Sequence, residues 1–138
     1  MIRRLQVAID CVQPSRLAAF WAEVLGYRLA EPPAGHASWD EFSEAEASQP
    51  DEQWRMLVDP DGTGPTVLLH RVPEPKVAKN RIHLDIWVDT EDQDREGAVL
   101  AEASRLVRLG GSVLRETRND GEFYVVMADP EANEFCIA

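Results

Sequence analysis

Acidic and aromatic side chains recur at alternate positions on two strand-like segments of the sequence. In the segment Ile82–Val88, apolar residues alternate with polar or aromatic ones, among them Asp85 and Trp87. In the segment Leu5–Val12, Asp10 has the same parity relative to the apolar residues. Because alternate side chains of a strand point to the same face, we expect these three residues on the polar strand faces. An indole and two carboxylates can hold a cationic or planar small molecule by stacking and by charge.

The segments that carry these residues belong to a pattern that occurs twice in the chain. In each copy, a strand leads into a helix that stops at a Leu-Gly pair, and three further strands follow. An Asp-Pro turn precedes the last strand of each copy. The Leu-Gly pairs are Leu25-Gly26 and Leu109-Gly110, and the turns begin at Asp59-Pro60 and Asp129-Pro130. A tandem duplication of this kind predicts two structural modules, at residues 1–75 and 80–138, within a single domain of residues 1–138.

The hydrophobic periodicity predicts the same elements in both modules. The expected strands are Leu5–Val12, Tyr27–Ala30, Trp54–Val58, Thr66–Val72, Ile82–Val88, Ser112–Arg115, Phe123–Ala128 and Glu134–Ile137. One helix opens at Pro14-Ser15, with Ser15 as its cap, and the other spans Val99–Leu109. A four-stranded sheet with one helix buries only one face. We therefore predict an α+β fold in which two tandem βαβββ modules form a curved eight-stranded concave sheet, with the helices on the convex side. The polar strand faces would line the resulting trough.

The segment Pro32–Gln53 does not fit either module. It is rich in acidic residues and proline, and we expect a long solvated connection that has room for one helical turn. It also carries Trp39 and Phe42. These aromatic side chains would either close over a bound ligand as a lid or anchor the connection to the core.

Composition excludes several classes of function. The chain has 138 residues, and its formal net charge of −11 argues against a nucleic-acid partner, since phosphate binding needs clustered Lys and Arg. No run approaches the roughly 20 apolar residues of a membrane span. Only Cys11 and Cys136 are present, which is too few for a disulfide framework. We therefore expect a cytoplasmic protein whose partner is a small molecule.

Three short motifs of the sequence resemble those of a known superfamily. They are Phe20–Tyr27, Lys79–Asp85 and Asp129–Phe135. Together with the paired βαβββ modules, they look like the vicinal oxygen chelate superfamily, which includes glyoxalase I, bleomycin-resistance proteins, extradiol dioxygenases and methylmalonyl-CoA epimerase. The likeness is strongest to the short glyoxalase-like domain proteins. It covers nearly the whole chain, and it implies a homodimer because members of this superfamily frequently dimerise.

The resemblance also implies a set of metal ligands. In metal-using members, the ligands come from the first and last strands of each module, which corresponds here to Gln6, His70, His83 and Cys136. Strand parity agrees for Gln6, His83 and Cys136, whereas His70 lies in a segment without alternation. Imidazoles and a thiolate suit a divalent ion such as zinc, and nickel, manganese or iron are the other candidates. Each residue also has an ordinary structural explanation, as a strand-face polar residue or a small buried hydrophobe.

The glutamates that glyoxalase chemistry requires at the ligand positions are absent. A carboxylate must move a proton at the substrate carbon, so the chain does not fit a true glyoxalase I. Extradiol dioxygenases need two histidines and a carboxylate on iron, and of these the mapping retains only His83. Two functions therefore stay open. One is a protein of the bleomycin-resistance type that binds a small molecule in the trough. The alternative is a metal-dependent lyase, isomerase or dioxygenase centred on His83.

Overall fold

The chain divides into two compact units, each built around one sheet. The computed structural model describes residues 1, 3–46, 53–91 and 93–138, with the side chains of 43–46 left aside. Unit 1 spans Met1–Pro75 and unit 2 spans Lys76–Ala138. The boundary lies at the start of the linker Lys76–Asn80 that the sequence predicts between the two copies. Each unit contains one βαβββ module, so the α+β class and the tandem modules are confirmed.

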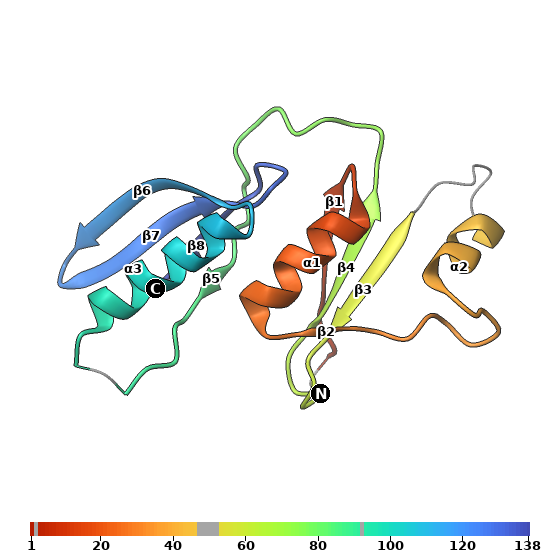
Figure 1. Cartoon of the computed structure of the whole chain (residues 1–138), viewed down its shortest axis with the longest axis horizontal. Helices are drawn as coiled ribbons and strands as arrows, with labels where there is room; N and C mark the ends of the chain where they lie inside the picture. The colour runs from red at the N-terminus through yellow and green to blue at the C-terminus, as the bar shows by residue number, and fades with distance from the viewer. Residues whose placement is uncertain (2, 47–52, 92) are drawn as a thin grey trace. The chain divides into compact units, whose positions relative to one another are not determined.

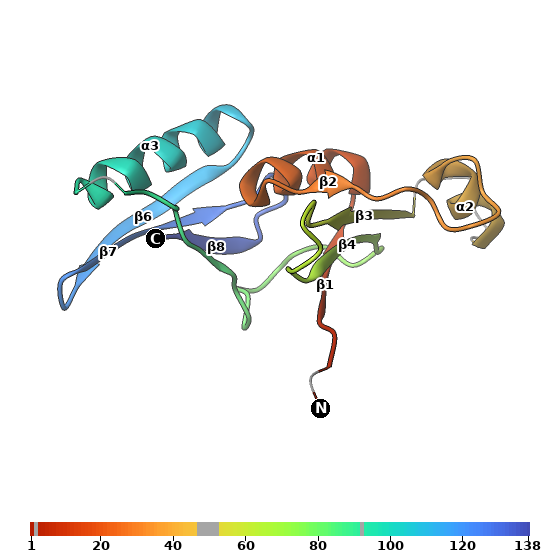
Figure 2. The same cartoon turned by 90° about the horizontal axis from the view of Figure 1, so that it is seen from below.

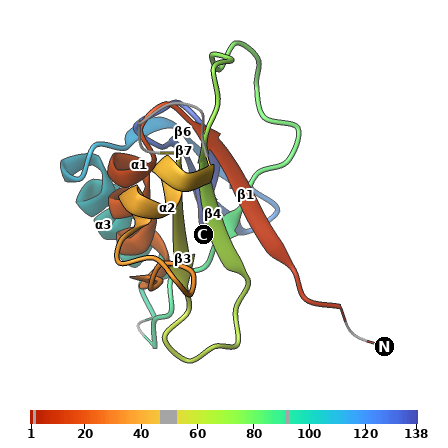
Figure 3. The ribbon, with the colours of Figure 1, turned by 90° about the vertical axis from the view of Figure 1, so that its right-hand side faces the viewer.

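Unit 1 holds the first module and one additional helix (Figure 1). Its elements are β1 Gln6–Cys11, α1 Pro14–Leu25, β2 Arg28–Leu29, α2 Trp39–Glu46, β3 Trp54–Val58 and β4 Thr66–Arg71. The strand order is β1-β4-β3-β2, with β1 parallel to β4 and the other pairs antiparallel. Figure 3 shows β1 at the edge of this sheet, beside β4.

Unit 2 repeats this topology. Its elements are β5 Asp85–Ile86, α3 Arg95–Arg108, β6 Ser112–Asn119, β7 Glu122–Ala128 and β8 Glu134–Ile137. The order is β5-β8-β7-β6, again with the first strand parallel to the last. The same βαβββ connection thus produces the same strand order twice, as expected of a duplicated sequence.

Strand pairing corrects part of the predicted architecture. In the described residues, hydrogen bonding divides the strands into two four-stranded sheets, one in each unit, rather than one eight-stranded sheet. The periodicity of a strand shows which face is buried, but it carries no information about which edges pair. The helix α2 is a second difference, because it is longer than the single turn that the acidic connection was expected to hold.

Several element boundaries also differ from the prediction, and helix α3 begins at Arg95, before the expected start at Val99. The strand expected at Ile82–Val88 is reduced to β5, whereas the strand expected at Ser112–Arg115 extends to Asn119. Helix α1 has Gln13 rather than Ser15 at its N-cap, and no side chain caps it. Pro14 occupies the first helical turn, where its missing N–H has no partner to lose.

The core of unit 1 lies between α1 and one face of its sheet. The apolar stripe of the helix is buried, including Leu17, Phe20 and Trp21. It packs against the sheet face that carries Leu57 and Leu69, both nearly inaccessible to solvent. The helix ends at Gly26, whose φ of 67° is the left-handed conformation that glycine adopts readily.

The sheet of unit 2 has one covered face and one open face. Alternate residues of β7 and β8 are completely buried on the side packed against α3, and these are Val125, Met127, Phe135 and Ile137. Figure 2 shows α3 lying along this side of the sheet. The intervening side chains, including Tyr124, Val126 and Cys136, therefore point to the opposite face. This open face holds the candidate site. No helix in the described part of the chain combines the length and apolar character needed to cross a membrane.

Candidate functional site

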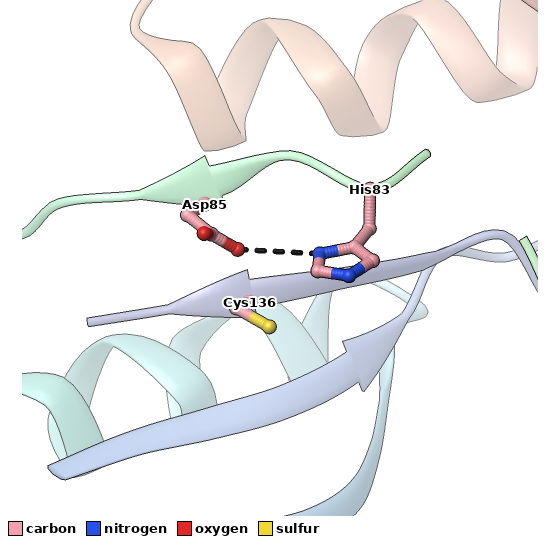
Figure 4. A group of neighbouring side chains, drawn as sticks. All are labelled: His83, Asp85 and Cys136. Atoms are coloured by element: carbon pink, nitrogen blue, oxygen red, sulfur yellow. Dashed lines mark hydrogen bonds and ion pairs between the residues drawn. The ribbon is translucent and has the colours of Figure 1, made fainter. Parts of the chain in front are cut away.

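Three potential ligand side chains meet on the open face of unit 2. His83 and Asp85 lie two positions apart on the segment that forms β5, and Cys136 lies opposite Asp85 on β8 (Figure 4). His83 Nδ1 is 3.4 Å from Asp85 Oδ1. One potential ligand atom from each of the three residues lies within 4.8 Å of the other two. Strand pairing therefore brings together an imidazole, a carboxylate and a thiol from segments about 50 residues apart in sequence.

The thiol of Cys136 is held in its neutral form. Burial raises the pKa of Cys136 to about 11, and the negative charge of Asp85 together with a hydrogen bond to it acts in the same direction. The positive charges of Arg115 and Lys79 oppose this rise in the pKa. Without a metal ion or another cation at the site, Cys136 is a thiol at neutral pH rather than a nucleophilic thiolate.

A pocket of about 430 Å³ lies beside this cluster, and His83 and Cys136 belong to its lining. Its lining comes entirely from unit 2 and consists of Lys79, His83, Leu114, Arg115, Tyr124, Val126, Glu134, Phe135 and Cys136. The strand register places Asp85, Cys136, Val126 and Arg115 side by side across the sheet, and all of these except Asp85 line the pocket. The pocket thus combines an apolar and aromatic wall with a few polar groups that converge on one place.

A β-bulge in β6 turns Arg115 toward this pocket. Before the bulge, Val113 pairs with Met127 of the covered face, and after it Arg115 pairs with Val126 of the open face. In a regular strand, residues 113 and 115 would share one face. The additional residue, Leu114, changes the parity, and both Leu114 and Arg115 line the pocket.

Glu134 belongs to the pocket lining, but its carboxylate is already engaged. Oε2 accepts the backbone N–H of Asn80 at 3.0 Å, and Lys76 Nζ lies 3.2 Å from the same oxygen. Burial acts to raise the pKa of Glu134, but these contacts outweigh it and hold the pKa below its ordinary value. The carboxylate therefore fastens the segment that enters unit 2 against β8.

Unit 1 places three of the predicted residues on the sheet face away from α1. Asp10 and His70 are register neighbours on β1 and β4, with His70 Nδ1 3.8 Å from Asp10 Oδ1. The imidazole also stacks on Trp54 at 3.9 Å between ring centroids. Gln6 pairs instead with Thr66, to which its amide donates a hydrogen bond of 3.1 Å. Gln6 and His70 are four strand positions apart, roughly 13 Å, and unit 1 does not bring them together.

The two predicted tryptophans lie in different surroundings. Trp39 is buried at the start of α2, and its indole N–H donates to the carbonyl of Ala30 at 2.7 Å. Trp87 follows β5 and remains 66% exposed, with the guanidinium of Arg95 5.4 Å from its ring centre. Trp39 thus has the contacts of an anchor for α2, and Trp87 presents an accessible aromatic surface.

Comparison with known proteins assigns the fold to a family. The family model described as a glyoxalase-like domain matches residues 6–138. The chain belongs to the glyoxalase-like domain family. This membership confirms the resemblance to the vicinal oxygen chelate superfamily that the sequence motifs indicate. A search of curated proteins returned no match.

Solved structures with the same fold are distant in sequence. A glyoxalase/bleomycin resistance protein/dioxygenase family enzyme from Burkholderia phytofirmans PsJN has a TM-score of 0.64 at 18% identity, over 96% of this chain and 94% of that one. A mutant of the fosfomycin resistance protein FosX from Listeria monocytogenes, complexed with Mn(II) and 1S,2S-dihydroxypropylphosphonic acid, has a TM-score of 0.65 at 13% identity, over 99% and 92%. Lactoylglutathione lyase from Agrobacterium tumefaciens gives 0.58 at 15% identity, over 98% and 91%. At these identities the likeness establishes the shared fold.

Several pocket residues of this glyoxalase-like domain were not singled out from the sequence. Glu134 and Tyr124 could have been found, because each is two positions from an open-face residue on its own strand. Arg115 could not, because its orientation depends on a bulge that no periodicity reveals. Lys79 lies in a segment without regular structure, so only the tertiary fold places it beside β8.

Proposed function

We propose that this glyoxalase-like domain binds a small organic molecule on the open face of unit 2, beside His83, Asp85 and Cys136. The pocket of about 430 Å³ is the observation that carries the proposal. Sites for small molecules are commonly concave, about 300–1,000 Å³ in volume, and mostly apolar with a few placed polar groups. Leu114, Val126 and Tyr124 provide the apolar and aromatic surface here.

A pocket-filling substitution tests this function. Val126 is buried at the centre of the pocket lining, so Val126→Phe places a ring in the space that a ligand would occupy. We expect benzamide, benzoate and benzylamine, used as simple aromatic probes, to shift the backbone amide resonances of the pocket strands if they bind. Val126→Phe should weaken the binding of any probe that does so by at least about tenfold through steric exclusion.

The matched control is Val107→Phe, which makes the same change on the exposed surface of α3. Its spectrum and its probe affinities should match those of the unmodified chain. The proposal would be abandoned if none of the probes shifted resonances of the pocket residues, or if Val126→Phe and Val107→Phe bound them equally well.

A metal-dependent reaction is the second candidate, and the donor set of His83, Asp85 and Cys136 favours it. One imidazole, one carboxylate and one thiolate would suit a zinc ion with an open fourth position, where the ion would supply Lewis-acid chemistry. Tetrahedral zinc ligands lie roughly 3.5 Å apart, and these ligand atoms lie within 4.8 Å of one another, so the side chains need to close by up to about 1.3 Å. The donor set therefore fits a zinc ion after small side-chain movements.

The thiol also distinguishes this donor set from a manganese site. Manganese(II) prefers oxygen ligands, whereas thiolate favours zinc and other softer ions. The Listeria protein is described with Mn(II), so the ion proposed here differs from the ion of that structural relative.

Cobalt(II) substitution tests the metal site, because cobalt bound to a thiolate has a charge-transfer absorption band in the near ultraviolet. We expect the band in the unmodified chain, its loss in Cys136→Ser, and weaker cobalt uptake in His83→Ala. Cys11→Ser is the matched control, since Cys11 is the other buried cysteine and belongs to unit 1. Absence of any uptake, or a band that survives in Cys136→Ser, would rule out this donor set.

A further inference from the structure

We infer that the pocket of unit 2 receives the anionic group of a small organic molecule, a carboxylate or a phosphonate, held by Arg115 and Lys79. This inference rests on the proposed binding function and specifies the chemical class of its ligand. It differs from the cationic ligand that the carboxylates Asp10 and Asp85 suggest when the sequence is considered alone.

The charges that line the pocket are positive once existing contacts are taken into account. Lys79, Arg115 and Glu134 are the charged side chains among the lining residues. The Asp85 carboxylate lies beside the pocket, where it already contacts His83 Nδ1 at 3.4 Å and the Cys136 thiol. The carboxylate of Glu134 already holds the backbone N–H of Asn80 and the ammonium group of Lys76. A ligand cation would therefore compete with a fixed ammonium group for Glu134.

The two cations are available to a ligand. Within the described residues, Lys79 Nζ has one contact, a long hydrogen bond of 3.3 Å to the carbonyl of Asn80. Among the described residues, the Arg115 guanidinium forms no ion pair and no hydrogen bond, and the residue is exposed. Both side chains line the same pocket as Cys136. The two positive charges are therefore presented to the same bound molecule.

The bulge at Leu114 is an independent indication that the guanidinium is directed to this place. Without the additional residue, Arg115 would have the parity of Val113 and belong to the covered face of the sheet. A bulge disrupts the hydrogen-bond ladder locally, and bulges are frequent beside functional sites, where they re-aim a side chain. Here the bulge places a planar bidentate donor next to the apolar surface of Leu114, Tyr124 and Val126.

The overall charge makes local recognition necessary. At a formal net charge of −11, the protein as a whole repels anions. Screening limits that repulsion to about 8–10 Å at physiological salt, so cations in direct contact can outweigh it. The ligand that matches the pocket has an anionic head for Arg115 and Lys79 and an apolar or aromatic body for the remaining wall.

A set of probes that share a phenyl ring and differ in charge tests the inference in the whole chain of 138 residues. The probes are phenylphosphonate and benzoate as anions, benzamide as a neutral analogue, and benzylamine as a cation. Backbone amide shifts of residues in β6, β7 and β8 report binding and locate it. We expect phenylphosphonate or benzoate to bind at least about tenfold more tightly than benzamide and benzylamine, because charge-assisted hydrogen bonds to a carboxylate or phosphonate are lost in both. Which of the two anions binds with the higher affinity distinguishes a phosphonate site from a carboxylate site.

Charge variants assign the effect to the two residues. Arg115→Gln and Lys79→Gln should each weaken the preferred anion by about three- to tenfold or more and leave benzamide unchanged. Arg115→Glu should reverse the preference toward benzylamine. Arg108→Gln is the matched control, since it removes the same charge from α3, on the covered face of the sheet, and should change no affinity.

The outcomes separate the inference from the function on which it rests. If benzamide or benzylamine bound in the pocket as tightly as the anions, the pocket would still bind small molecules, but the anionic class would be wrong. Equal anion affinities in Arg115→Gln and Arg108→Gln would overturn the assignment to Arg115. If no probe shifted any pocket resonance, both the inference and the proposed binding function would be rejected.

Discussion

The Asp59 carboxylate accepts four hydrogen bonds within the turn between β3 and β4. Its Oδ2 accepts the backbone N–H groups of Gly64 at 2.7 Å and Thr63 at 3.1 Å, and the Thr63 hydroxyl at 2.9 Å. Its Oδ1 accepts the N–H of Asp61 at 2.9 Å. The hydrogen bonds from Gly64 and Asp61 contribute most to lowering the pKa of Asp59 to about 2. The ionised form therefore stabilises the turn between β3 and β4.

This shift predicts a specific loss of stability in acid. Because the folded-state pKa is lowered, the contribution of Asp59 is complete above its unfolded pKa, near 4, and disappears as the pH falls toward about 2. We expect Asp59→Asn to lower the free energy of unfolding at pH 6, and the difference from the unmodified chain to shrink as the pH approaches 2. Urea unfolding at several pH values measures this difference.

Asp61→Asn is the control for this prediction. It removes a charge from the same turn, and the Asp61 backbone N–H that binds Asp59 remains in place. Its free energy of unfolding should follow that of the unmodified chain much more closely. A constant difference between Asp59→Asn and the unmodified chain across the acid range would contradict the role given to the ionised carboxylate.

At the scale of elements, the two Asp-Pro turns have the same construction in both units. Asp129 accepts the backbone N–H groups of Glu131 and Asn133 and the Asn133 side-chain amide. Each turn therefore uses one aspartate to satisfy several backbone donors just before the last strand of its module. In unit 2, that turn sets the position at which β8 begins and hence the position of Cys136.

The turn of unit 1 has an additional steric requirement at Gly64. A Cβ atom at this position would lie 2.0 Å from the hydroxyl oxygen of Tyr27, which follows α1. Partial burial, and then the charge of Asp59, raises the pKa of Tyr27, so the hydroxyl remains protonated beside the turn. The close approach of these two segments depends on a residue without a side chain.

A double-mutant cycle tests this contact between Gly64 and Tyr27. Gly64→Ala should destabilise the chain by about 1–3 kcal/mol through overpacking. Tyr27→Phe removes the oxygen that clashes, so it should recover much of this loss in the Gly64→Ala background. The measurement is the free energy of unfolding of the single and double variants. Additive effects, with no coupling between the two positions, would show that another contact sets the cost.

At the scale of the whole molecule, the duplicated topology carries different chemistry in its two copies. In unit 2, the in-register pair Asp85 and Cys136 belongs to the group of potential ligands that His83 completes. By the repeat pattern of the sequence, Gln6 of unit 1 corresponds to His83 of unit 2. The pair of unit 1 that is equivalent to Asp85 and Cys136 is therefore Ala8 and Leu68, which has no ligand atoms. Both copies therefore preserve the scaffold, and the His83–Asp85–Cys136 donor set belongs to the second copy.

The sequence alone determined the modules and the faces of their strands. The duplicated Leu-Gly and Asp-Pro signals identify both βαβββ modules, because helix ends and turns depend on local backbone conformation. Alternation predicts that His83 and Asp85 share a face, since the geometry of a strand has a period of two. These features depend on local sequence alone. The three motifs that resemble the superfamily also allowed the superfamily to be identified.

Only the tertiary structure decided which side chains meet. Pairing between β5 and β8 places Cys136 next to Asp85, and hydrogen-bonded strands far apart in sequence are not specified by local periodicity. The bulge at Leu114 determines the direction of Arg115, and the contacts of Glu134 leave Lys79 and Arg115 as the available charges among the residues that line the pocket. Strand pairing also produced two four-stranded sheets where one of eight was expected, because an alternating pattern defines faces and leaves the partner of each edge open.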